Sequence, residues 1–418
     1  MKAYWFLIAA LGILLGIRVL VFWQNAPHYQ AGQPFSANYT FLSNPTVKYG
    51  SQIFTVNGVT IYAPEFPSFS YGDRVQIKGV IGERGVSRTK TSGSSKKGDQ
   101  VTKILVLKNP RINNLNQNNL LIASAARVRS VVTRDFHNYL GNDEAALLLG
   151  VVFGIKENMS QTLYTGFKNT GVLHVIAASG ENVSIVSGFL LALFSHFMRR
   201  KYAIVLTILA IGYYAILSGL DPSIVRASLM GIFAFGALFF GRQYYGLFAL
   251  MMVAWIMLMI NPLQVTDVGF LLSFSSTLGI ITIYPLLSKL WIFQLPLLDD
   301  VSTTLAAQIA SIPVMLYFFS TYSTISILVN MLVLWTVPIL MMLGGVAALI
   351  FFIPILSGLL LYLAYPLLLY FEKMTLFFSQ KPLNFELSAF PISIIIGYYF
   401  LLAAVILHLK PSLKTNEK

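Results

Sequence analysis

Long apolar stretches constrain this chain more than any other feature. The first runs from Tyr4 to Trp23, interrupted by Arg18, and eight more follow after residue 200. A helix needs about 20 apolar residues to cross a bilayer. Charged residues make up 11% of the 418 residues, against roughly 25% in an average soluble domain. The chain is therefore expected to be an integral membrane protein, and a soluble enzyme is excluded.

The apolar stretches predict a helical bundle over residues 145–409. Clear spans are expected near 202–218, 223–240, 244–260, 268–287, 303–319, 324–353, 355–378 and 391–409. Pro338 and Gly344-Gly345 predict a kink in the long sixth span. Residues 145–198 hold polar groups within apolar sequence and predict a discontinuous or re-entrant segment. With an uncleaved anchor over residues 1–23, we expect about ten crossings.

The short loops predict the orientation of the bundle. Arg199-Arg200-Lys201, Arg242, Lys289 and the tail over residues 410–418 fall on one side. The positive-inside rule makes that side the cytoplasm. We therefore expect a multi-pass membrane protein with both termini in the cytoplasm, and the polar segment after the anchor on the outer side.

That polar segment, residues 24–142, carries 14 basic and 5 acidic residues. Alternating segments around Asn57-Gly58 predict a hairpin with a type I′ turn. Arg74–Ile81 and Val101–Leu107 alternate as well, and Tyr71-Gly72-Asp73 predicts a turn. We expect a small β-barrel over residues 36–112 with a mobile loop at 87–100. An amphipathic helix is expected over 118–142, with Arg127, Arg129 and Arg134 off its apolar side.

Cations lie beside aromatic residues in the predicted β domain. This arrangement suits single-stranded nucleic acid, because charge follows the phosphates and rings stack on bases. A solvated basic surface that docks on anionic lipid explains the composition equally well. The candidate binding residues are Arg74, Lys78, Arg84, Arg88, Lys90, Lys96, Lys97, Lys103 and Tyr71.

Polar residues inside the predicted bundle are candidates for lining a channel. A charged group at bilayer depth costs roughly 2.5–3.5 kcal/mol on insertion scales, so such a group normally faces protein or water rather than lipid. The candidates are His174, Ser179, Glu181, Asn182, Asp221, Arg226, Gln308 and Asn330. Structural alternatives stay open for several. Asp221 and Asp267 suit helix caps, and Arg226 has the reach to pair with Asp221 or to snorkel outward. Gln308 and Asn330 suit interhelical hydrogen bonds.

Several kinds of chemistry find little support in the sequence. Cysteine is absent, and the five histidines lack metal-ligand spacing. A nucleotide-binding glycine motif is also missing. Ser179, His174 and Glu181 supply the residue types of a hydrolase triad, but three residues from one short segment rarely converge. We expect no resident metal or cofactor and a transporter rather than an enzyme.

Four segments, in order, resemble the ComEC family of competence proteins. They are GVVFGIKENMSQTLYTGFKNTGVLHVIAASGENVSIVSG (150–188), AILSGLDPSIVRASLMGIF (215–233), NPLQVTDVGFLLSFSSTLGI (261–280) and LAAQIASIPVMLYFFSTYSTISILVNMLVLWTVP (305–338). The β segment with its Tyr71-Gly72-Asp73 turn resembles the family's OB-like domain. The resemblance covers roughly residues 1–409.

The resemblance implies a channel in the bacterial cytoplasmic (inner) membrane that imports single-stranded transforming DNA, with the OB-like domain outside. It also implies membrane lipid and a separate DNA receptor, nuclease and cytosolic motor as partners. Many relatives carry a C-terminal metallo-β-lactamase-like nuclease domain, whereas this chain ends soon after its last span. The family's usual Ser-Gly-Leu-His is Ser179-Gly180-Glu181-Asn182 here. Transport of another anionic polymer or of lipid, and a vestigial paralogue, are the alternatives.

Overall fold

The computed structural model describes residues 2–25, 29–48, 50–87, 101–115, 119–155, 159–176, 180–289, 299–319, 321–323, 325–380, 384–386 and 392–412. The chain divides into two compact units. One, the β unit, is Val21–Arg129. The other, the helical unit, combines Met1–Leu20 with Ser130–Lys418. The predicted mobile loop lies almost entirely outside the described residues.

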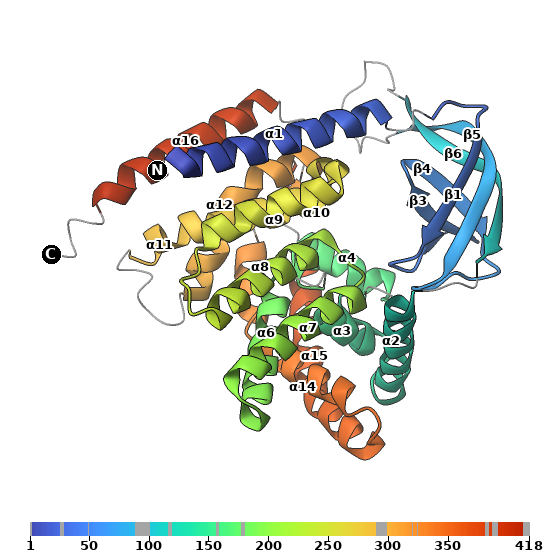
Figure 1. The fold of residues 1–418 in the computed structure, drawn as a ribbon. Helices are drawn as coiled ribbons and strands as arrows, with labels where there is room; N and C mark the ends of the chain where they lie inside the picture. The colour runs from blue at the N-terminus through green and yellow to red at the C-terminus, as the bar shows by residue number, and fades with distance from the viewer. Residues whose placement is uncertain are drawn as a thin grey trace. The chain divides into compact units, whose positions relative to one another are not determined.

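The β unit contains one six-stranded sheet (Figure 1). Its strands are β1 (Pro34–Thr40), β2 (Thr46–Lys48), β3 (Ser51–Val56), β4 (Val59–Pro64), β5 (Arg74–Ser87) and β6 (Val101–Asn114). The order across the sheet is β1-β5-β6-β4-β3-β2. Neighbours are antiparallel except β4 and β6, which run parallel. Strands β5 and β6 are longer than the sequence pattern predicts, because β5 continues past Ile81 to Ser87 and β6 continues past Leu107 to Asn114.

The turns of the β unit follow from local sequence. Asn57 and Gly58 have φ values of 50° and 82°, as a type I′ turn requires. The predicted β3–β4 hairpin is therefore confirmed. Gly72, at φ 95°, makes the turn before β5. A Cβ there would lie 2.9 Å from the side chain of Ala126, so glycine also permits close packing against α2 (Leu120–Tyr139).

The sheet curls so that its two ends share one core. Phe41, just after β1, lies with its ring centroid 4.9 Å from that of Phe54 in β3. Tyr39 of β1 stacks on the same Phe54 ring at 6.0 Å. Strands β1 and β3 are four places apart in the sheet, so a flat sheet would keep these rings far from one another. Buried aliphatic residues such as Val59, Ile61, Val75 and Ile77 complete this core.

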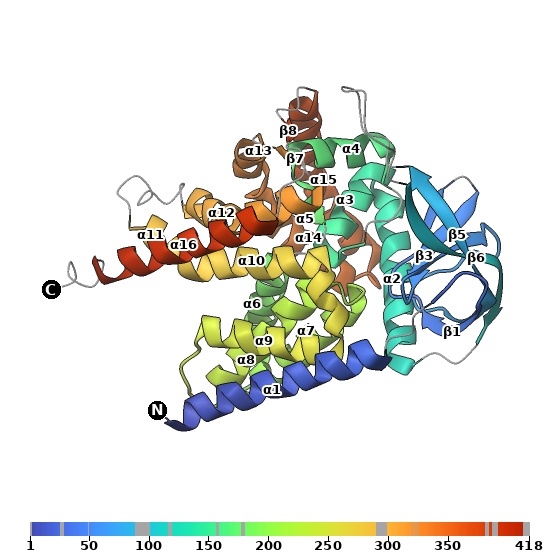
Figure 2. The ribbon, with the colours of Figure 1, turned by 90° about the horizontal axis from the view of Figure 1, so that it is seen from above.

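The helical unit consists mostly of α-helices (Figures 1 and 2). Helices α1 (Lys2–Asn25) and α2 each have residues in both units. The others are α3 (Asn142–Phe153), α4 (Gln161–Thr170), α5 (Leu173–Ile176), α6 (Gly180–Phe197), α7 (Arg200–Leu217), α8 (Pro222–Phe239), α9 (Gly246–Ile260), η1 (Pro262–Thr266), α10 (Val268–Thr282), α11 (Tyr284–Leu287), α12 (Asp299–Phe319), α13 (Ser326–Val333), α14 (Thr336–Leu349), α15 (Pro354–Ser379) and α16 (Ile392–Ser412). Short strands β7 (Thr321–Ser323) and β8 (Asn384–Glu386) pair with each other.

Within the described residues, five helical stretches are long and apolar enough to cross a membrane. They are Arg200–Leu217, Pro222–Phe239, Val268–Leu287, Val301–Phe318 and Pro354–Ser379. Shorter apolar helices lie at Leu11–Asn25, Gly246–Ile260, Thr336–Leu349 and Ser393–His408. Each of the eight predicted spans thus corresponds to one or two helices. Five of the eight predicted spans contain a helical stretch long enough to cross a membrane.

The segment expected to be discontinuous is divided into four helices, α3 to α6. Helix α3 has 12 residues, which at about 1.5 Å rise per residue is about 18 Å, too short for a crossing. It ends at Gly154 in a left-handed conformation, and α4 ends the same way at Gly171. Every residue of α3 from Ala145 to Phe153 is buried. The polar backbone at its C-terminal end is therefore enclosed by protein, as membranes require.

The long sixth span is interrupted between α13 and α14, at Leu334 and Trp335. Pro338 lacks an N–H group, and its ring conflicts with the carbonyl of Leu334 four residues earlier. That carbonyl instead accepts from the Val337 amide at 3.0 Å. The hydroxyl of Thr336 satisfies the Val333 carbonyl at 2.7 Å. The sequence predicts a kink, and the structure has a break in the helix four residues before Pro338, while Gly344-Gly345 lies within the continuous helix α14.

Candidate functional site

Arg226 is the charged residue buried most deeply among the candidates in the helical unit. It lies one turn into α8, which begins at Pro222 after Asp221 in the N-cap position. Proline suits the first helical turn because its missing N–H has no partner there in any helix. The side chain of Arg226 is 7% exposed. It does not snorkel outward but turns into the bundle.

The guanidinium of Arg226 joins α8 to α10. Its Nε donates to the hydroxyl oxygen of Ser273 at 2.6 Å. Its Nη1 lies 3.5 Å from the sulfur of Met230, and Cζ lies 6.0 Å from the ring centre of Phe274. All three partners are neutral. The site thus holds a cation in a setting of hydroxyl, thioether and aromatic groups.

Helix α6 reaches the same guanidinium through Gly180. A Cβ at Gly180 would lie 2.6 Å from Nη2 of Arg226, so only glycine permits this approach. Helix α8 contacts both α6 and α10 (Figure 1). Residues far apart in the chain, at 180, 226 and 273, therefore meet at one point. We call Gly180, Arg226, Met230, Ser273 and Phe274 the arginine cluster.

Asn182 lies two residues after Gly180 and faces the end of α3. Its Nδ2 donates to the carbonyl of Val151 at 2.7 Å, and the side chain is 1% exposed. The hydroxyl of Tyr214 donates to the next carbonyl, that of Val152, at 2.7 Å. The last turn of a helix leaves carbonyls without helical partners. These two side chains therefore close the end of the short buried helix.

The other candidates from the same segment lie at the helix starts or outside the described residues. Glu181 is exposed in the first turn of α6, and Asp221 is partly buried before α8. Ser179 falls outside the described residues, and so does the side chain of His174, whose backbone belongs to α5. Asp267 caps α10, because its carboxylate accepts from the Phe270 amide at 2.8 Å. The interpretation of Asp267 as a cap is confirmed.

A second polar cluster lies between α12 and α13. Nε2 of Gln308 lies 3.4 Å from the hydroxyl oxygen of Ser326. Asn330 is one turn further along α13 and is 2% exposed. Among the described residues its Oδ1 has no hydrogen-bond partner. The structure thus brings Gln308 and Asn330 to the same helix pair, away from the contacts of Arg226.

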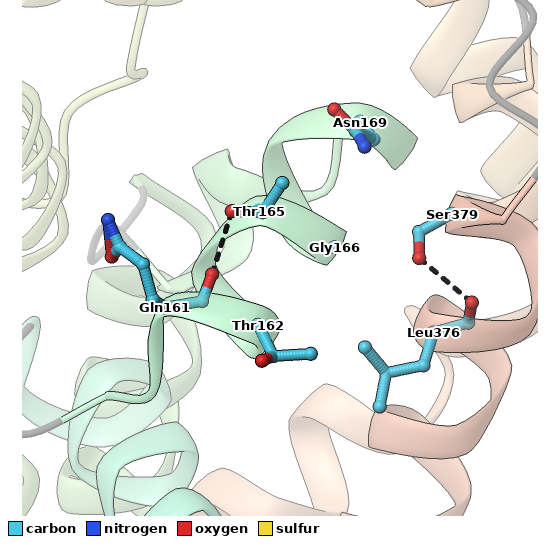
Figure 3. Close-up of a pocket in the computed structure, with 7 residues that line it drawn as sticks. All are labelled: Gln161, Thr162, Thr165, Gly166, Asn169, Leu376 and Ser379. Atoms are coloured by element: carbon cyan, nitrogen blue, oxygen red, sulfur yellow. Dashed lines mark hydrogen bonds between the residues drawn. The ribbon is translucent and has the colours of Figure 1, made fainter.

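A pocket of about 390 Å³ lies between α4 and α15 (Figure 3). Its lining residues are uncharged: Gln161, Thr162, Thr165, Gly166 and Asn169 on α4, and Leu376 and Ser379 on α15. Hydroxyls of Thr165 and Ser379 donate to carbonyls of their own helices, as Figure 3 shows. Because this lining contains no charged side chain, the arginine cluster is the stronger candidate for recognising an ion.

The β unit exposes a pair of cations on neighbouring strands. Lys78 of β5 lies directly opposite Arg111 of β6, and both are exposed. Like charges in this position repel each other. Arg111 was not among the candidates from the sequence, because the strand that carries it was expected to end at Leu107. Ser273 was also missed, because one serine in an apolar helix carries no distinctive signal.

Tyr71 and Arg129 differ from their sequence-based description. Tyr71 is 6% exposed, and the guanidinium of Arg129 lies 4.2 Å above its ring. Arg129 is itself 8% exposed, so its placement off the apolar side of the helix was wrong. It follows buried Ala125 by four residues and therefore shares its face. The aromatic ring accommodates the charge.

The remaining basic candidates are described in part. Arg74 is partly buried at the start of β5. The side chains of Arg84 and Lys103 lie outside the described residues, as do Arg88, Lys90, Lys96 and Lys97 entirely. Among the predicted binding residues whose side chains the structure describes, Lys78 is therefore the fully exposed cation.

Comparisons with known proteins agree with the resemblance seen in the sequence. A family model described as "Competence protein" matches residues 151–412, which include the whole arginine cluster. "ComE operon protein 3" of Bacillus subtilis (strain 168) is 28% identical over 198 residues. That match covers 47% of this chain and 25% of the relative. No solved structure matches. With its β unit and several apolar helices of spanning length, the chain is a multi-pass membrane protein that belongs to the competence protein (ComEC) family.

Proposed function

We propose that this protein is the channel through which single-stranded DNA enters the cytoplasm during natural competence. Family membership supports a role in DNA uptake. The observation that carries the more specific proposal is the burial of Arg226 within helices that are otherwise apolar. A polyanion cannot cross hydrocarbon without polar groups along its route. A fixed cation inside the bundle supplies such a group.

The β unit would collect the DNA on the outer side of the membrane. Lys78 and Arg111 lie side by side on its surface, and their mutual repulsion falls when a phosphate lies between them. Contact between Phe41 and Phe54 across the curled sheet supports an OB-like barrel over residues 36–112. Because Tyr71 is buried, we assign strand binding here to charge rather than to stacking on that ring.

For the surroundings of the channel we carry forward the expectations drawn from the sequence. We propose a cytoplasmic-membrane location, about ten crossings, cytoplasmic termini and an outward-facing β unit. The proposed division is an anchor over 1–23, a connecting helix over 118–142, a bundle over 145–409 and a tail over 410–418. A DNA receptor, a nuclease and a motor would be separate proteins. The chain itself would transport without catalysing a reaction, and Gln308 and Asn330 would extend the polar lining.

A transformation assay tests the proposal. In a naturally transformable host deleted for this gene, Arg226→Gln should reduce transformants by at least tenfold, because it removes the buried cation. Arg242→Gln is the matched control, since Arg242 is exposed just beyond the other end of α8. Immunoblots of isolated membranes verify that the wild-type protein and both variants are present in equal amounts. Normal transformation in the deletion strain would contradict the proposal and favour a vestigial paralogue.

A second assay separates DNA from other anionic cargo. Labelled single-stranded DNA and anionic lipid vesicles are offered to the full chain in nanodiscs of neutral lipid. We expect micromolar or tighter binding of single strands that weakens steeply with salt. Binding of anionic vesicles without DNA binding would instead support transport of lipid or another anionic polymer.

A further inference from the structure

We propose that the ring of Phe66 is a platform on which one nucleobase of a single DNA strand stacks. The inference rests on the proposed function, because it names a contact by which the β unit holds the strand to be imported. Three features of the β unit support it: the exposure of the ring, the hydrogen bonds that hold its loop, and the charges beside it.

Phe66 lies in the loop between β4 and β5, residues 65–73, and its side chain is 78% exposed. The two other aromatic residues of this loop, Phe69 and Tyr71, are 8% and 6% exposed. The ring of Phe69 belongs to the core, where it stacks on the ring of Phe41 with centroids 5.4 Å apart. The loop thus buries two of its rings and presents the third to solvent.

The buried side chain of Gln52, on β3, holds this loop in one shape. Gln52 is 1% exposed, and its Oε1 accepts from the Phe69 amide at 2.9 Å. Its Nε2 lies within hydrogen-bond distance of three backbone carbonyls, those of Pro64 (2.7 Å), Glu65 (3.1 Å) and Pro67 (2.9 Å). The backbone on both sides of Phe66 is therefore held before any ligand arrives.

A ring that is both exposed and held suits base stacking. Single exposed apolar residues are common on protein surfaces, so exposure by itself assigns no role to Phe66. The hydrogen bonds of Gln52 add a second observation, because a loop that is already ordered loses little entropy on binding. Aromatic side chains stack on any base, since every base has a π-face. This tolerance fits the import of strands of any sequence.

The charges of the loop favour a base over a lipid surface. Residues 65–73 include Glu65 and Asp73 but no lysine or arginine. Segments that insert apolar side chains into anionic membranes are rich in basic residues. The exposed cations that suit phosphates lie on the sheet instead, at Lys78 and Arg111. The β unit thus offers a ring for a base and separate cations for the backbone of the strand.

Oligonucleotide binding to the full chain in nanodiscs of neutral lipid tests the proposal. The probes are an oligothymidylate strand and an abasic strand of the same length and charge. We expect the wild type to prefer oligothymidylate. Phe66→Leu should weaken oligothymidylate binding by about tenfold, the scale of one lost base stack. It should leave the abasic strand and the salt dependence unchanged, because no charge is removed.

Two further variants complete the test. Phe240→Leu is the matched control, since Phe240 in the helical unit is 75% exposed, and it should bind both strands as the wild type does. Phe66→Ser removes the apolar side chain altogether, whereas leucine keeps one. If stacking is the contact, Phe66→Leu and Phe66→Ser should weaken oligothymidylate binding alike.

Equal oligothymidylate affinity in the wild type and Phe66→Leu would overturn the proposal, and so would a loss in Phe66→Ser alone. Binding of phosphatidylserine vesicles that Phe66→Ser abolishes, with DNA binding unchanged, would replace it with membrane docking. Salt-sensitive DNA binding that ignores Phe66 would refute the stacking but not the proposed function. Base-dependent binding in a protein whose deletion leaves transformation normal would refute the function but not the stacking.

Discussion

The hydroxyl of Tyr398 in α16 donates to the carbonyl oxygen of Ile309 in α12 at 2.8 Å, four residues before Pro313. Proline has no N–H, so the carbonyl four residues earlier loses its helical partner. Tyr398 replaces that partner from a different helix. The adjacent Tyr399 donates to the next carbonyl, that of Ala310, also at 2.8 Å. Helix α16 thus completes the hydrogen bonding of α12 at its proline.

We predict that Tyr398→Phe lowers the free energy of unfolding by about 1–3 kcal/mol, the usual cost of leaving a shielded acceptor unsatisfied. Thermal unfolding of purified protein in detergent measures the change. Tyr362→Phe in α15 is the control, because Tyr362 is 73% exposed. Equal stability of the two variants would show that solvent or lipid headgroups satisfy the Ile309 carbonyl instead.

Close packing of α10 on α12 yields a second prediction. A Cβ at Gly279 would collide with the carbonyl oxygen of Ala306 and lie 2.6 Å from the Ala310 side chain. Gly279→Ala should therefore destabilise the protein by roughly 1–3 kcal/mol, the range for overpacking. The same substitution at Gly236 in α8, where a Cβ meets nothing within 4 Å, should be neutral or stabilising. Thermal unfolding curves of the two variants, recorded under the same conditions, measure the difference in stability. A greater loss of stability in Gly236→Ala than in Gly279→Ala would contradict the close packing at Gly279.

The cap of α10 supports a third prediction. Asp267→Ala removes the acceptor for the Phe270 amide and should cost about 1 kcal/mol. Asp267→Asn keeps an acceptor of the same length and should cost much less. Thermal unfolding again measures both. A loss of the same size in both variants would assign the effect to the charge of Asp267 rather than to its hydrogen bond.

The basic pair of the β unit supports a fourth prediction. Lys78→Gln and Arg111→Gln should each weaken binding of single-stranded DNA to the full chain. Each should also reduce the slope of log affinity against log salt by about 0.7, the value for one phosphate contact on a single strand. Fluorescence anisotropy at several salt concentrations provides the slopes. Arg199→Gln, at an exposed arginine before α7, should change neither quantity.

Local features of the fold were predictable because neighbouring residues decide them. Asn57 and Gly58 adopt positive φ with little strain whatever surrounds them, so these two residues are enough to predict the hairpin. Pro338 removes its own hydrogen bond, so the interruption of the sixth span needs no knowledge of other helices. The buried side of α2 was predicted less well. Arg129 joins that side only because the ring of Tyr71 lies there to receive its charge.

The amino-acid sequence by itself determined that this protein is a membrane protein of the competence family, because apolar length and ordered motifs are properties of the chain. Tertiary structure alone decided what Arg226 contacts. Gly180 and Ser273 lie 46 residues before it and 47 after it, and only the packing of α6, α8 and α10 brings them together. The packing of the helices decides whether neutral or acidic side chains surround a buried cation. From the sequence alone, any carboxylate in the chain could be the partner of Arg226.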